Sequence, residues 1–70
     1  METYEKAQEL IKLIKQHKVT QYRASEVSGI KHNLIKRYQD DEEKLYGATY
    51  RNIKRLSDAY DEIEQHWLNK

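Results

Sequence analysis

Apolar residues recur at helical spacing in four stretches of this sequence, and each stretch predicts one helix. The first covers residues 3–17, where the apolar side chains share one helix face. Shorter patterns predict helices over residues 21–28 and 32–39, and a longer one predicts a helix over about residues 49–69. The predicted fold class is therefore all-α, with four helices read from these patterns.

The last predicted helix carries the longest apolar seam of the chain. Its members follow 4-3-4-3-4 spacing, which keeps them on one helix face: Thr49, Ile53, Leu56, Tyr60, Ile63 and Trp67. No Gly or Pro interrupts the seam, so we expect one continuous helix. Residues 40–48, which precede it, are expected to form an acidic loop with Gly47 as the turn residue. Thr49 is then expected to cap the helix that follows.

Residues 20–39 carry the local signals of a helix, a tight turn and a second helix. We expect Thr20 to cap the first helix, because its hydroxyl can accept a hydrogen bond from a free backbone N–H of the first turn. Gly29 should end that helix, since glycine adopts positive φ without a clash of Cβ. The small side chain of Ala24 lets the two helices cross closely, as a helix-turn-helix requires.

One face of the second helix in this unit is polar and basic. At 100° per residue, four polar side chains fall within about 140° of one another, opposite the apolar side chains. The four are His32, Asn33, Lys36 and Arg37. In the major groove, Asn can pair bidentately with adenine, and Lys or Arg with guanine. The face is therefore a candidate for reading bases; the alternative is an ordinary solvated helix face.

The charge distribution favours a polyanionic partner. Residues 10–39 contain seven basic side chains against one acidic side chain, a net charge of +6, although the whole chain carries only +1. Residues 40–70 contain five basic side chains against eight acidic ones, a net charge of −3. A protein with this polarity can meet a nucleic acid with one side and keep the other side turned away.

Several other classes of protein are disfavoured by the same sequence. It has no Cys for disulfides or thiolate metal sites, and no stretch apolar enough for a signal peptide or a membrane span. Glu62 and His66 form a lone i,i+4 pair, and two ligands do not make a metal site. No nucleophile, base and orienting residue combine into a catalytic set. We expect a cytoplasmic protein that is not an enzyme, with no cofactor and no small-molecule substrate.

The middle of the chain resembles the Cro and phage-repressor type (XRE-like) helix-turn-helix DNA-binding domains, over residues 19–60. The resemblance rests on Thr20-Gln21, Ala24, Val27, Ser28-Gly29-Ile30, Ile35, Arg37 and Tyr38, and more weakly on Thr49-Tyr50-Arg51-Asn52-Ile53 and Leu56. It implies one small lambda-repressor-like domain of four to five helices, residues 1–70, with its helix-turn-helix core at residues 20–39. Lys31 stands where the family has a Ser or Thr cap, which should cost the second helix about 1 kcal/mol.

That resemblance implies a sequence-specific transcriptional regulator that binds double-stranded DNA with the second helix of the unit in the major groove. The expected DNA contacts are Gln21, Lys31, His32, Asn33, Lys36, Arg37, Thr49 and Arg51. Of these, Gln21 is expected at the phosphate backbone. The alternative is a protein-interaction module, an antitoxin or an adaptor, that binds a partner through acidic residues 40–43 and the C-terminal helix.

A homodimer is also expected, because a single recognition helix of about two turns reads only a few base pairs. The C-terminal seam extends past what a small core needs, and a Trp at its end is typical of an interface anchor. The expected interface consists of Tyr60, Ile63, Trp67 and Leu68.

Overall fold

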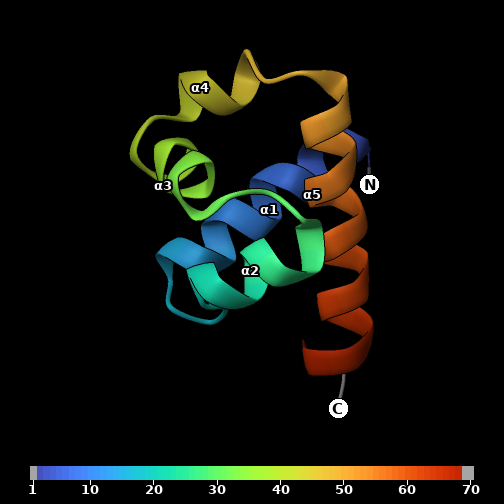
Figure 1. Ribbon diagram of the computed structural model, residues 1–70. Coiled ribbons are helices and arrows are strands. Elements are labelled where there is room, and N and C mark those ends of the chain that lie inside the picture. The colour runs from blue at the N-terminus through green and yellow to red at the C-terminus, as the bar shows by residue number, and fades with distance from the viewer. Residues whose placement is uncertain (1, 69–70) are drawn as a thin grey trace.

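A computed structural model describes residues 2–68 of the protein, with side chains through residue 66, and that part of the chain contains helices and no strand (Figure 1). The elements are α1 Thr3–Lys15, α2 Gln21–Ser28, α3 His32–Asp40, α4 Glu42–Tyr46 and α5 Tyr50–Ile63, followed by the π-helical segment η1 Glu64–Leu68. The all-α prediction is confirmed.

The most extensive packing between helices joins α1 and α5, and α5 also packs against α2. In Figure 1, α5 runs along one side of the molecule, and α3 and α4 lie on the other side. The core between them contains the largest fully buried side chains, which are Leu10, Ile35, Leu56 and Ile63. At the edge of the α1–α5 interface, Lys6 Nζ lies 3.0 Å from Asp61 Oδ2. This ion pair is partly exposed, so apolar burial contributes more to the contact than charge does.

The C-terminal helix does not break near Tyr60, as the uninterrupted seam predicts. Glu64, which follows α5, has α-helical backbone angles (φ −59°, ψ −45°), and the chain continues directly into η1. Ile63, near this junction, is only 1% exposed and belongs to the domain core. The prediction that Ile63 lies on a free dimer surface is therefore wrong, because the single chain already buries that side chain.

The acidic segment predicted as a loop contains the short helix α4 instead. Asp41 caps it, because its Oδ1 accepts a hydrogen bond from the Glu43 N–H at 3.0 Å. Leu45 anchors it in the core with 2% exposure. Gly47 follows with φ −86°, so this turn does not need the positive φ that glycine permits. The loop prediction overlooked that one aspartate cap and one buried leucine suffice to hold a single helical turn.

The first helix ends two residues earlier than predicted, at Lys15. His17 adopts a left-handed conformation with φ 61°. Its N–H donates to the Ile14 carbonyl and the N–H of Lys18 donates to the Leu13 carbonyl, each at 3.0 Å. These two bonds satisfy carbonyls at the end of α1 in the pattern of a Schellman motif, with His17 at the position that glycine usually occupies.

Candidate nucleic-acid interface

The unit formed by α2, a short turn and α3 has the caps that its sequence predicts. The Thr20 hydroxyl accepts a hydrogen bond from the Arg23 N–H at 3.0 Å. Gly29 has φ 74°, and its N–H donates to the Ser25 carbonyl at 2.9 Å. Both predictions are confirmed, and together they fix where α2 begins and where the chain turns toward α3.

Two serine side chains hold the turn between α2 and α3. The Ser28 hydroxyl donates to the Ala24 carbonyl at 2.6 Å and accepts from the buried Ile30 N–H at 3.2 Å. The Ser25 hydroxyl donates to the Ile30 carbonyl at 2.6 Å. Both polar groups of the Ile30 backbone are thus satisfied inside the domain. The sequence analysis did not predict this role of the two serines. The pattern that indicates it is a pair of serines, three residues apart, in the helix that precedes Gly29.

The buried and exposed sides of α3 are those that helical spacing predicts. Ile35 and Tyr38 are buried in the core. The side chains of His32, Asn33, Lys36 and Arg37 are exposed. Lys31 is exposed at the N-cap and makes no side-chain capping hydrogen bond, as its chemistry predicts. The fold therefore presents all four side chains of the candidate reading face to solvent.

Gln21 has a structural contact as well as its predicted place at the start of α2. Its side chain is half-buried, and its Nε2 donates a hydrogen bond to Oε1 of Gln39 in the last turn of α3. Gln21 therefore joins α2 to α3 in addition to lying at a helix N-terminus. The predicted phosphate contact of Gln21 stays a prediction.

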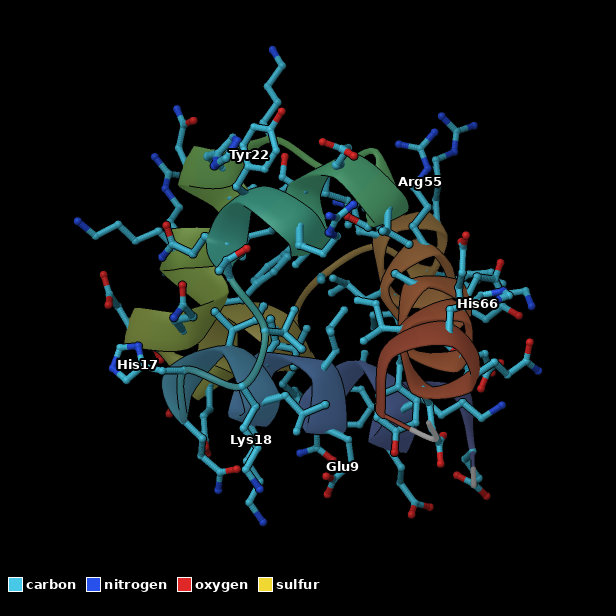
Figure 2. The ribbon with its side chains drawn as sticks, turned by 90° about the horizontal axis from the view of Figure 1, so that it is seen from below. Glu9, His17, Lys18, Tyr22, Arg55 and His66 are labelled. Atoms are coloured by element: carbon cyan, nitrogen blue, oxygen red, sulfur yellow. The ribbon has the colours of Figure 1, made fainter. Side chains whose placement is uncertain are left out.

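Tyr22 is an exposed residue of α2 that sequence reasoning did not assign to the site. It is 65% exposed, and its ring centroid lies 5.9 Å from that of His32 in a tilted arrangement. Figure 2 shows Tyr22 on the side of the molecule where α2 meets the start of α3. The candidate interface thus extends from α3 onto α2, and the sequence signal was an aromatic residue next to a helix N-terminus.

The two predicted DNA contacts of this region, Thr49 and Arg51, lie at the start of α5, and their contact with DNA stays a prediction. The Thr49 hydroxyl accepts from the Asn52 N–H at 3.3 Å, which confirms it as the N-cap of α5, and Arg51 is exposed in the first turn. Neither residue lines the hollow of about 360 Å³ that separates α3 from α5. Its lining consists of Gly29, Ile30, Lys31, Asn33, Leu34, Arg37, Asn52 and Arg55. Asn52 and Arg55 are the residues of α5 that lie beside the predicted recognition helix.

A hydrogen bond fixes α5 against α3 at this hollow. Asn52 Nδ2 donates to the Tyr38 hydroxyl at 3.3 Å. Tyr38 is only 3% exposed and belongs to the core, and Asn52 lies in the first turn of α5, close to its N-cap. Both partners are therefore part of helices. This hydrogen bond links the helix that carries Arg37 to the helix that carries Arg55.

Basic side chains on this surface lack the acidic partners found elsewhere on the molecule. Away from it, Lys6 pairs with Asp61, Lys15 with Glu42 and Lys54 with Asp58, at distances of 3.0, 3.8 and 3.1 Å. Among the side chains that the structure describes, no carboxylate pairs with Lys31, Lys36, Arg37 or Arg55. These positive charges remain available to an anion from outside the chain.

The predicted dimer surface is only partly described. Tyr60 is half-buried against the core; burial raises the pKa of its hydroxyl above the ordinary value, and the negative charge of Glu64 adds to that effect. Ile63 is buried, as described above, and Trp67 and Leu68 lie outside the residues whose side chains are described. The dimer therefore stays a prediction.

Between residues 2 and 68, every helix is too short or too polar to span a lipid bilayer. Over the same range, no three His, Asp or Glu side chains gather into a group that could hold a metal ion.

Comparison with known proteins gives no assignment. The sequence matches no family model, and neither the curated proteins nor the solved structures contain a match to it.

The bracing of the turn leads to a stability prediction. Replacing Ser28 by alanine (Ser28→Ala) leaves the buried Ile30 N–H without its acceptor, which should lower the free energy of unfolding by about 1–3 kcal/mol. Urea unfolding followed by circular dichroism measures the change. Ser25→Ala is the matched comparison, because it removes only a donor to a carbonyl oxygen. A loss at Ser28 no larger than the loss at Ser25 would contradict the role given to Ser28.

Proposed function

We propose that this protein is a sequence-specific regulator of transcription that binds double-stranded DNA, with α3 as the recognition helix in the major groove. It acts by occupying an operator, in the manner of the Cro and phage-repressor proteins that its sequence resembles. The observation that carries the proposal is the exposed face of α3, where His32, Asn33, Lys36 and Arg37 present imidazole, amide, ammonium and guanidinium groups to solvent. The one carboxylate of this helix, that of Asp40, belongs to its last residue.

The local chemistry of α3 supports this assignment. Asn33 and Lys36 offer the hydrogen-bonding groups that read adenine and guanine edges, and both are exposed. Arg37 is exposed one position further along the helix and can reach a guanine or a phosphate. Neither the hydrogen bonds nor the ion pairs of the described side chains use these three residues, so their polar groups are available to a ligand.

The acidic helix α4 is the observation that favours the second candidate, a protein-interaction module such as an antitoxin or an adaptor. Asp41, Glu42 and Glu43 are exposed at its start, and Tyr46 at its end is 79% exposed. Such a surface suits a basic partner protein and would repel DNA. Direct measurement of duplex binding separates the two candidates.

We further propose that the protein binds DNA as a symmetric homodimer. One helix of this length reads only a few base pairs, and two copies on an inverted repeat would place their recognition helices about 34 Å apart, one turn of DNA. Since Ile63 belongs to the core, the proposed interface rests on the other predicted residues, Tyr60, Trp67 and Leu68, of which Tyr60 is half-buried.

The test of the proposed function is the salt dependence of duplex binding. Affinity for duplex DNA should fall steeply between low and physiological salt, because each phosphate contact releases condensed counterions. Fluorescence anisotropy with a labelled duplex of about 20 base pairs measures it. Affinity that does not change with salt, or no binding at all, would reject DNA binding and leave the protein-interaction module.

The reading face is tested by substitutions within α3. Asn33→Ala and Lys36→Ala should each cost about 1–3 kcal/mol on a site selected from a random duplex pool, and much less on random DNA, because base contacts act only on the correct sequence. Gln21→Ala should weaken both duplexes to a similar extent. The assignment is wrong if Asn33→Ala leaves the ratio of the two affinities unchanged.

The proposed dimer is tested by comparing two positions on the C-terminal seam. Trp67→Ala should shift the protein toward monomer in sedimentation equilibrium while its circular dichroism stays unchanged. Ile63→Ala should instead lower the free energy of unfolding by about 2–5 kcal/mol, because it opens a cavity in the core. A monomeric unaltered protein at high micromolar concentration would refute the dimer.

A further inference from the structure

We infer that the hollow between α3 and α5 is a phosphate-binding site, in which Arg55, Arg37 and Lys31 hold a backbone phosphate of duplex DNA. This inference rests on the proposed function, and it names a contact outside the recognition helix. Arg55 is its central residue, because it comes from a different helix and was not among the residues predicted to touch DNA.

The lining of the hollow has the composition that a phosphate requires. It contains three cationic side chains, from Lys31, Arg37 and Arg55, and no carboxylate. Asn33 and Asn52 add side-chain amides, whose N–H groups can donate to phosphate oxygens. Guanidinium groups bind phosphate with two parallel hydrogen bonds, so two arginines at one hollow favour an oxyanion over any neutral ligand.

Arg55 at the hollow lacks the acidic partner that its neighbour Lys54 has. Lys54 precedes Arg55 in the chain, and its ammonium donates to Asp58 Oδ1 at 3.1 Å; this hydrogen bond raises the pKa of Lys54 and neutralises its charge locally. Arg55 has no such partner among the described side chains. Of two adjacent basic residues, the one that lines the hollow is the one whose charge is not neutralised by the fold.

The hollow is held open by structure that does not depend on a ligand. Its apolar part consists of Ile30, which is buried, and Leu34, which is half-buried and packs against the core. The hydrogen bond from Asn52 to Tyr38 joins its two walls. A preformed site of this kind binds an anion without first ordering a loop.

The hollow lies on the side of the molecule that the proposed interface occupies. In Figure 2, Arg55 and Tyr22 point to the same side, whereas Lys18 and Glu9 point to the opposite side. Asn33 and Arg37 belong both to the exposed polar face of α3 and to the lining of the hollow. A duplex with its major groove on α3 would therefore bring one of its phosphate strands to Arg55.

The experiment measures the salt dependence of duplex binding for Arg55→Ala. One phosphate contact contributes about 0.9 to the slope of log affinity against log salt, so the slope should decrease by about 0.9 and the affinity at 0.1 M salt by about eightfold. The loss should be the same on selected and random duplexes, because a phosphate contact carries no sequence information. Arg55 is exposed, and an unchanged thermal melt will show that the fold is retained.

Two further variants separate the hollow from net charge. Lys18→Ala removes one positive charge from the opposite side and should leave the slope unchanged. Arg55→Lys keeps the charge and should retain most of the slope while losing part of the affinity, because the bidentate geometry is lost. If Arg55→Ala and Lys18→Ala change the slope equally, the inference is overturned, although the proposed function stands.

Titration with inorganic phosphate distinguishes the source of the ligand. The side-chain Nε–H signals of Arg37 and Arg55 should shift in NMR spectra before those of Arg23 and Arg51. If they shift in a protein that does not bind duplex DNA, the hollow is a site for free phosphate, and both the DNA source and the proposed function are wrong. Equal shifts at all four arginines would show that the hollow is not a phosphate site.

Discussion

Burial of the apolar seam of α5 is the constraint on which the rest of this small domain depends. The seam packs against α1 and α2 together, and Leu56 and Ile63 in it are almost completely buried. Each aliphatic side chain buried in this way contributes about 1.5–3 kcal/mol, a large share of the stability available to 70 residues. Ala24 of α2 and Ala59 of α5 are also buried, and their small side chains let the backbones approach closely. Once α2 is fixed on α5, the short turn after Gly29 determines the direction of α3.

The hydrogen bonds that satisfy the backbone of the turn between α2 and α3 do not involve the exposed face of α3. The polar backbone groups of this turn form hydrogen bonds within α2 and at Ile30, and the residues that provide them are Ser25, Ser28 and Gly29. The fold therefore does not need the polar side chains of α3 that face solvent. A helix held from behind by Ile35 and Tyr38, and from its start by the turn, can keep its whole outer face for a ligand.

Charge is arranged so that the two ends of α3 differ. Lys31 lies at its start beside the hollow that Arg55 lines, whereas Asp40 and the acidic turn of α4 lie at its end. At physiological ionic strength, salt screens the interaction between surface charges beyond about 8 Å. A ligand that lies along the helix therefore interacts with each end separately. Under the proposed function, the phosphates of DNA are attracted to the basic start of α3 and the hollow, and they are repelled by the acidic helix α4.

The sequence by itself determined helices α1, α2, α3 and α5, the N-caps of α2 and α5 and the buried face of α3, because these depend on spacing and on side-chain chemistry within a few residues. Thr20, Gly29 and Thr49 act as predicted, and the exposed side of α3 is the predicted one. Helix α4 was missed because its buried residue, Leu45, is a single apolar position without periodicity. The tertiary structure alone decided that Ile63 belongs to the core and that Asn52 and Arg55 lie beside Lys31 and Arg37. Those outcomes depend on how α5 crosses the other helices, and such a crossing brings together residues about 20 positions apart, which no local pattern records.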